Sequence, residues 1–160
     1  MVSLDFLEKV DVFKNLDDGQ LTGVQGCCSE AEYKRDNLIF STSEEPLFLW
    51  IVQEGEVDLR QKNPDPSEKR EDTISSIFEA MTFGWSSLVP PFRYRLSAYC
   101  ATRSCKIIKI DRNCLLKLFE NDASLGYEVM SEIVSVIGTR FHHLREGMIK
   151  NLGEDIINKW

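Results

Sequence analysis

The stretch FGWSSLVPPFRYRLSA, residues 83–98, is the most informative part of the sequence. Gly84 permits a tight turn with positive φ, and the two serines after Trp85 can cap a short helix. The two prolines at positions 90–91 then end that helix. Free backbone N–H groups at such a turn form an anion site, and Arg95 can direct its guanidinium at the same place. Taken alone, the segment is better explained as a tight turn with surface arginines, because short Gly-Ser turns are common.

Short strands surround this segment. Residues 47–52 (LFLWIV) are apolar throughout, as in a strand buried on both faces, whereas residues 57–60 (VDLR) alternate, as in a half-buried strand. Residues 63–72 form a polar, proline-containing loop, which predicts a hairpin tip. Seven or eight strands at fairly regular spacing, the last over residues 105–111, predict an antiparallel β-roll or jelly roll over residues 31–111.

Helical spacing precedes the predicted roll, over residues 1–30. Ser3 is a plausible N-cap, and apolar side chains in residues 4–16 continue the spacing of one helix. Asp17 and Gly19 interrupt that helix, and a second short helix follows. We therefore expect two helices before the first strand.

The helical period returns after the last predicted strand, over residues 112–160. Asp111 is a plausible N-cap for a first helix over residues 112–120, and residues 123–149 predict one long helix that ends by Gly153. A chain of 160 residues is the length of one domain. We therefore expect a single domain of the α+β class, mainly β, with N-terminal helices and a long C-terminal helix.

The long helix carries a regular apolar stripe. Its members follow spacings of 4, 3, 4, 3 and 4 and are Met130, Val134, Ile137, Phe141, Leu144 and Met148. This is the heptad seam of a two-helix coiled coil, which favours a homodimer through the C-terminal helix. The alternative is an amphipathic helix on the domain's own core. Both hold if the first turns pack on the roll and the later turns pair with a second copy.

The charge of the chain argues against nucleic acid as a partner. The net charge is −7 and the sequence pI is about 4.9, a poor match to the basic footprint that phosphate backbones require. The N-terminus has no basic region followed by a long apolar run, and no stretch approaches the ~20 apolar residues of a membrane span. We therefore expect a cytoplasmic protein without a DNA or membrane partner.

Cysteine and histidine are the residue types from which a metal or redox site would be built. The cysteines are odd in number and form no C-x-x-C: Cys27, Cys28, Cys100, Cys105 and Cys114. We expect reduced, mostly buried thiols, and the alternative is an iron–sulfur or redox sensor. His142 and His143 are adjacent and point in different directions on a helix, so we expect no metal-binding pair. No Ser/His/Asp arrangement or paired carboxylates suggest catalysis, so we expect no catalytic residue and no enzyme.

Residues 83–98 resemble the phosphate-binding cassette of cyclic-nucleotide-binding domains, found in bacterial catabolite-activator-type regulators and in kinase regulatory subunits. The family pattern is Phe-Gly-Glu, a few small or apolar residues, a short helix, and then an arginine that binds phosphate. Phe83 and Gly84 match, and Arg95 falls at a spacing that fits that arginine. Further stretches over residues 4–148 resemble the family in the same order: VDVFKNL (10–16), YKRDNLIF (33–40), LWIVQEGEV (49–57) and IKIDR (108–112).

This resemblance implies a sensory or regulatory module that signals through a C-terminal dimerisation helix. Its ligand would be a cyclic nucleotide, such as cyclic AMP, or another phosphate-bearing molecule, with no metal. The implied ligand-binding residues are Phe83, Gly84, Trp85, Ser86, Ser87, Arg95, Leu96 and Ser97. Activators of the family carry a helix-turn-helix domain after the long helix, and about a dozen residues follow Ile149 here. We therefore expect a stand-alone sensor, or a fragment that acts on a protein partner.

Two positions depart from the family pattern. Trp85 stands where the family has a glutamate that accepts the ribose 2′-hydroxyl, and an indole N–H is only a donor. Asp36 stands at the usual glycine of the first strand turn. Trp85 can stack on a ring or fill the ribose space. The alternative function is therefore a protein–protein interaction module whose pocket is vestigial and binds no nucleotide.

Overall fold

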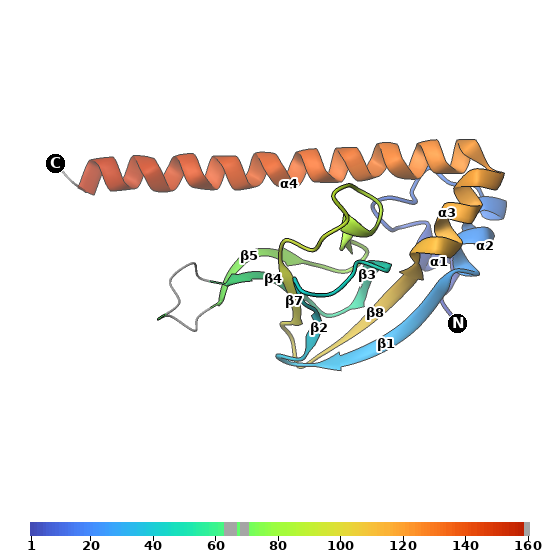
Figure 1. The fold of residues 1–160 in the computed structure, drawn as a ribbon, viewed down its shortest axis with the longest axis horizontal. Coiled ribbons are helices and arrows are strands. Elements are labelled where there is room, and N and C mark those ends of the chain that lie inside the picture. Colours follow the sequence, from blue (N-terminus) through green and yellow to red (C-terminus); the bar gives the residue numbers. More distant parts are fainter. Residues whose placement is uncertain (63–66, 68–70, 159–160) are drawn as a thin grey trace.

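The computed structural model describes residues 1–62, 67 and 71–158. Two short helices, a roll of two sheets and two C-terminal helices follow one another along the chain (Figure 1). The predicted α+β jelly roll is confirmed. The hairpin tip predicted over residues 63–72 lies largely outside the described residues.

The described residues form eight strands in two four-stranded antiparallel sheets. The first sheet has the order β1–β8–β3–β6, and the second has the order β2–β7–β4–β5. The strands are β1 (Cys28–Lys34), β2 (Leu38–Phe40), β3 (Phe48–Glu54), β4 (Val57–Lys62), β5 (Glu71–Ile77), β6 (Thr82–Phe83), β7 (Ser97–Cys100) and β8 (Ser104–Asp111). The first strand begins at Cys28, shortly before the predicted boundary at residue 31.

Strand β3 connects the two halves of the core. Leu49 and Ile51 pack in the cluster beneath the helices, whereas Trp50 and Val52 pack in the cluster between the sheets. All four side chains are buried. Because neighbouring side chains of a strand point to opposite faces, a strand covered on both faces is apolar throughout. The prediction of burial on both faces is confirmed.

The N-terminal segment is less helical than its apolar spacing predicts. Helix α1 (Leu4–Leu7) is capped by Ser3 as expected, but residues 8–15 form turns and bends. The prediction of one helix through residue 16 is wrong because the apolar residues of this stretch reach the core from turns. Asp17, predicted as a break, is the N-cap of α2 (Asp18–Gln25) and forms a capping box.

Helix α4 (Ala123–Asn158) lies across the roll and continues beyond it (Figure 1). Helix α3 (Arg112–Asn121) precedes it and begins at the predicted N-cap Asp111, whose carboxylate accepts a hydrogen bond from the backbone of its first turn. Helix α4 continues past Gly153, so the prediction that it ends there is wrong. A glycine in a helix costs only about 1 kcal/mol relative to alanine, which a long helix tolerates. Among the described helices, none is both long and apolar enough to cross a membrane.

Four of the five cysteines form two pairs, Cys27–Cys114 and Cys100–Cys105. The expectation of reduced thiols is therefore wrong for these four residues, although burial is confirmed for Cys27, Cys100 and Cys105. The first pair joins the end of α2 to the first turn of α3. Cys28 is unpaired, and burial raises the pKa of its thiol to about 12. The described residues contain no group of three His, Cys, Asp or Glu side chains that could hold a metal ion.

Candidate functional site

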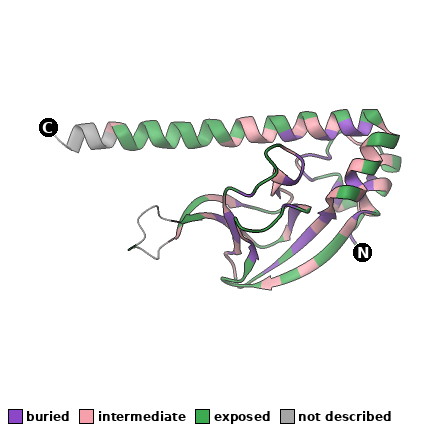
Figure 2. Cartoon of the chain, in the orientation of Figure 1, coloured by how far each residue is buried: buried purple, intermediate pink, exposed green. Residues whose placement is uncertain are grey.

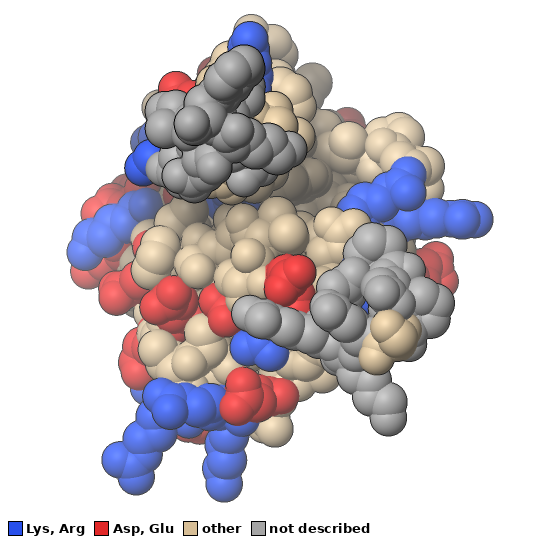
Figure 3. All heavy atoms as spheres, turned by 90° about the vertical axis from the view of Figure 1, so that its left-hand side faces the viewer, with Lys and Arg blue, Asp and Glu red and all other residues tan. Residues whose placement is uncertain are grey.

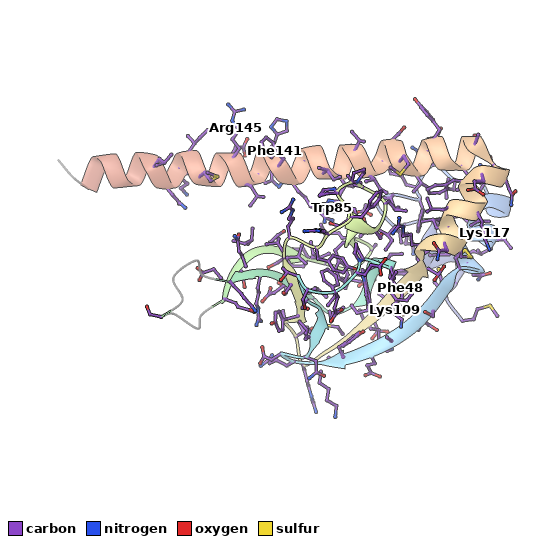
Figure 4. The ribbon with its side chains drawn as sticks, in the orientation of Figure 1. Phe48, Trp85, Lys109, Lys117, Phe141 and Arg145 are labelled. Atoms are coloured by element: carbon purple, nitrogen blue, oxygen red, sulfur yellow. A yellow bond between two sulfur atoms is a disulfide. The ribbon has the colours of Figure 1, made fainter. Side chains whose placement is uncertain are left out.

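The segment between β6 and β7 lies directly beneath α4. It contains the short 3-10 helix η1 (Trp85–Ser87), and Figure 4 shows Trp85 between the roll and α4. Gly84 adopts a φ of 70°, as its place in the sequence predicts. A Cβ atom at this position would lie 2.5 Å from Cδ1 of Trp50, so the turn needs glycine both for its backbone angle and for space.

A cavity of about 370 Å³ lies between this segment and α4. Its lining residues come from β4, β5, the cassette segment and α4: Leu59, Ile74, Ser75, Trp85, Leu96, Ile137, Arg140, Phe141, His143 and Leu144. A smaller hollow of about 150 Å³ shares Leu59, Trp85 and Leu96 with it and is also lined by Phe40, Gly84, Ser86, Tyr94 and Arg95. Figure 3, viewed from the C-terminal end of α4, shows mostly uncharged atoms beneath that helix. The two hollows are therefore neighbouring parts of one site beneath α4.

The structure brings five of the eight predicted ligand-binding residues to this site: Gly84, Trp85, Ser86, Arg95 and Leu96. The other three face the protein. Phe83 is fully buried and stacks between aromatic rings of the core. The Ser87 hydroxyl donates to the carbonyl oxygen of Gly84 at 3.1 Å, and the Ser97 hydroxyl accepts from the backbone N–H of Thr42 at 3.3 Å. These two buried serines therefore hold the loop in shape.

Arg95 is exposed at the edge of the smaller hollow. No described residue forms an ion pair with it, unlike Arg60, which lies 3.3 Å from Asp58. A guanidinium without a protein partner can offer its donors to a carboxylate or phosphate. Its proposed role in ligand binding stays a prediction.

An aromatic cluster fixes the backbone next to Arg95. The Tyr94 ring stacks on Phe40, with ring centroids 3.8 Å apart, and the Trp50 indole N–H donates to the Tyr94 hydroxyl at 3.1 Å. Burial raises the pKa of Tyr94 to about 12, so this hydroxyl stays neutral. The cluster ties the chain on the N-terminal side of Arg95 to the core of the roll.

Arg140 of α4 is the main site residue that the sequence did not predict. Its guanidinium carbon lies 4.9 Å from the ring centroid of Trp85, which is a cation–π contact. Its Nη2 atom lies 3.6 Å from a carboxylate oxygen of Asp11 and donates to the carbonyl oxygen of Thr82. One side chain of α4 thus contacts the predicted ligand site, the N-terminal segment and β6.

In the Asp11–Arg140 pair, burial opposes the charge of each group, whereas the opposite charge of the partner favours it. Burial is the largest influence on both groups: it raises the pKa of Asp11 and lowers the pKa of Arg140. Hydrogen bonds from Thr82 and the charge of Arg140 lower the pKa of Asp11 but do not cancel the effect of burial. The Nε and Nη1 atoms of Arg140 are buried without a hydrogen-bond partner. Burial therefore opposes the charge on both members of the pair that anchors α4 over the site.

The apolar stripe of α4 divides into two parts. Met130 and Ile137 are half-buried against the core beneath the helices. The other members are exposed and are Val134 (67%), Phe141 (62%), Leu144 (44%) and Met148 (65%). Figure 2 shows that the later turns of α4 are mostly exposed. Part of the predicted stripe thus packs on its own domain, and pairing by the rest stays a prediction.

A comparison with protein families matches the cyclic nucleotide-binding domain over residues 30–122, more than half of the chain. The chain belongs to the cyclic nucleotide-binding domain family. The match covers most of β1, all of β2 to β8 and the whole cassette, and the matched family is a binding domain. No curated protein matches the chain.

Solved structures of this family share the fold of this cyclic nucleotide-binding domain. A Geobacter metallireducens protein named for cyclic nucleotide binding is 26% identical, with a TM-score of 0.76, over 89% of this chain and 100% of that chain. A cyclic nucleotide-binding domain from Methylobacillus flagellatus is 17% identical, with a TM-score of 0.78, over 92% of this chain and 81% of that chain. The regulatory subunit of a cAMP-independent protein kinase A from Trypanosoma brucei, a mutant bound to cAMP in its A site, is 18% identical, with a TM-score of 0.70, over 91% of this chain and 50% of that chain. The last two similarities concern the fold alone.

Proposed function

We propose that this domain is a sensory module that binds a small anionic ligand, a cyclic nucleotide or another acid, beneath α4. The observation that carries this proposal is the cavity of about 370 Å³ whose walls include Trp85 of the cassette and Arg140 of α4. Its size falls in the range of small-molecule sites, roughly 300–1,000 Å³. A ligand in this space contacts the roll and the helix together.

The contacts of Arg140 supply a route from the ligand to α4. A ligand that moves the Trp85 ring changes the cation–π contact with Arg140, and Arg140 also contacts Asp11. Because burial opposes the charge on both members of that ion pair, a small change in the site can alter how α4 is held. The helix is thereby the output element of the module.

The exposed half of the α4 stripe supports a second part of the proposal, pairing with another copy of the chain, in which Phe141 and Leu144 are shared between the seam and the wall of the larger cavity. Heptad spacing and exposed apolar side chains are the features of a coiled-coil seam. We expect the wild-type chain to be a dimer by light scattering and Met148→Glu to be a monomer. Thr139→Glu, on the same helix but off the stripe, is the matched control and should remain dimeric. A dimeric Met148→Glu variant would place the interface elsewhere.

Thermal unfolding and calorimetry with a ligand panel test the binding proposal. The panel contains cyclic AMP, cyclic GMP, cyclic dinucleotides, linear nucleotides and simple organic acids. A ligand at about 100 times its Kd stabilises the folded state by about 2.7 kcal/mol. We expect at least one saturable response that is lost in Arg95→Ala and kept in Arg93→Ala, because Arg93 is exposed and does not line either hollow.

The alternative is an interaction module with a vestigial pocket. The stacking of Trp85 against Arg140 favours it, because it fills part of the space beneath α4. The remaining cavity favours the sensor. A panel without any response would support the interaction module, and the search would then turn to protein partners of α4.

A further inference from the structure

We infer that the ligand of this site is a small apolar acid: an aromatic or aliphatic body that carries a single carboxylate or phosphate, and not a nucleotide. The inference rests on the proposed function and names the ligand class for the same cavity. Three observations carry it: the apolar walls, the lack of acidic side chains among the described lining residues, and Arg95, a lining arginine that has no ion-pair partner among the described residues.

The walls of the larger cavity are apolar on three sides. Leu59 and Ile74 come from β4 and β5, Leu96 comes from the cassette segment, and Ile137, Phe141 and Leu144 come from α4. Apolar surface that leaves water for such a site contributes to binding roughly in proportion to its area. A hydrophobic body therefore suits this space better than a hydroxylated one.

Acidic side chains are missing from the described lining of the site. The chain has 26 aspartates and glutamates, yet neither hollow is lined by one among the described residues. The charged or titratable side chains that do line them are Arg95, Arg140, His143 and Tyr94, and Tyr94 is neutral. In an acidic protein, this distribution favours an anion and offers no charged acceptor to a ligand donor.

A nucleotide would bring several donors that this site leaves unmatched. Ribose hydroxyls and the amino group of a base need acceptors when they are buried. Trp85 is only a donor, and one of the two lone pairs of the Tyr94 hydroxyl already accepts from Trp50. The other side-chain acceptors among the described lining residues are the hydroxyls of Ser75 and Ser86 and the imidazole of His143, fewer than the hydroxyl and amino donors of a nucleotide together with its base require. A ligand without hydroxyl and amino donors avoids this cost.

The contacts of the two lining arginines, Arg95 and Arg140, indicate how many acidic groups the ligand carries. The charge of Arg140 is already paired with Asp11 and stacked on the Trp85 ring, although its Nε and Nη1 atoms have no hydrogen-bond partner, whereas Arg95 has no ion-pair partner among the described residues. One anionic group at Arg95 therefore satisfies the free charge of the site. The body of the ligand then extends past Trp85 toward α4.

Isothermal titration calorimetry on the full chain tests this inference. The probes are naphthalene-2-carboxylate, octanoate, naphthalene-2-carboxamide, cyclic AMP and inorganic phosphate. We expect at least one of the two carboxylates to bind one site per chain. It should bind at least about tenfold more tightly than the neutral amide, phosphate and cyclic AMP, because only it combines the charge with an apolar body.

Variants separate this site from non-specific apolar binding. Arg95→Ala should weaken the carboxylate at least about tenfold, and Arg93→Ala should leave it unchanged. Ile74→Ser, which removes apolar lining from an exposed strand position, should weaken the carboxylate several-fold without unfolding the chain.

Each contrary result has a distinct meaning. Tighter, Arg95-dependent binding of cyclic AMP would overturn the ligand class and keep the sensor. Equal binding of amide and carboxylate, or a carboxylate unaffected by Arg95→Ala, would also overturn the inference. If neither these probes nor the wider nucleotide panel bound, both the ligand class and the proposed function would fail.

Discussion

Replacement of Asp11 by alanine tests how α4 is held over the site. The change removes the acceptor of the Thr82 N–H and hydroxyl and the counter-ion of Arg140, and Thr82 is buried. A buried donor left without an acceptor costs about 1–3 kcal/mol, and Asp11→Ala leaves both the N–H and the hydroxyl of Thr82 without theirs. Because 22% of Asp11 and 13% of Arg140 remain exposed, water relieves part of this cost. We expect Asp11→Ala to lower the free energy of unfolding by about 2–3 kcal/mol.

The substitution Asp11→Asn separates the hydrogen bonds from the charge. Burial raises the pKa of Asp11, so the folded chain binds this proton more tightly than the unfolded chain. A neutral side chain of the same shape should therefore cost less than about 1 kcal/mol at pH 7. The sign of the pH dependence follows from the same shift. The stability of the wild type relative to Asp11→Asn falls as the pH rises from the ordinary value of 3.8 through the raised pKa.

Urea denaturation at pH 4 and pH 7 measures these differences. The slope of the transition should be unchanged, so the loss appears as a lower midpoint. Glu79→Ala, at an exposed position, is the control and should change stability by less than about 0.5 kcal/mol. A change of less than about 0.5 kcal/mol in Asp11→Ala, or an equal loss in Asp11→Asn, would refute the balance described for the Asp11–Arg140 pair.

Three further substitutions test other parts of the fold. Gly84→Ala should destabilise the chain by about 2 kcal/mol or more and abolish ligand binding, because its Cβ would meet Trp50; a wild-type melting curve would contradict the turn geometry. Ala80→Gly should raise stability by about 1 kcal/mol in urea, because Ala80 has a φ of 63°, and a loss would refute strain there. Cys27→Ser should lower stability by up to about 4 kcal/mol in non-reducing buffer, since Cys27 pairs with Cys114 across 87 residues. An unchanged melting temperature would show that this pair is reduced in solution.

Local sequence signals predicted the elements that depend on neighbouring residues. The apolar run of β3, the Asp111 cap of α3 and the Gly84 turn each follow from a few adjacent side chains. Asp36, at the family's usual glycine, adopts a φ of 64°, so the turn keeps its backbone shape with a residue that tolerates this region. The chemistry of each residue and its immediate neighbours is therefore enough to predict these features.

Features that join distant residues could not be predicted in the same way. Arg140 and Asp11 meet only after the chain has folded, and so do Cys27 and Cys114. One signal for Arg140 was present: it lies between Ile137 and Phe141 on the inner face of α4, where a charge is unexpected. A charged residue on an otherwise apolar helix face is therefore worth treating as a site candidate.

The roles of individual cassette side chains also depend on tertiary packing. Ser86 and Ser87 are neighbours of the same type, yet Ser86 lines the hollow and Ser87 donates to the backbone of Gly84. Phe83 matches the family pattern because the core needs it, and it lines neither hollow itself. A motif can thus predict the loop correctly while it assigns ligand contacts to residues that shape the loop.

The central claim is that a small anion binds between the cassette and α4, against Trp85. NMR spectra of the three tryptophan indole N–H groups, assigned by single substitutions, test it most directly during titration with naphthalene-2-carboxylate, octanoate and cyclic AMP. We predict a saturable shift of the Trp85 signal with at least one ligand, absent in Arg95→Ala, and a smaller shift of Trp50, whose N–H is bonded to Tyr94. A Trp85 signal that stays unchanged with every ligand would contradict the site.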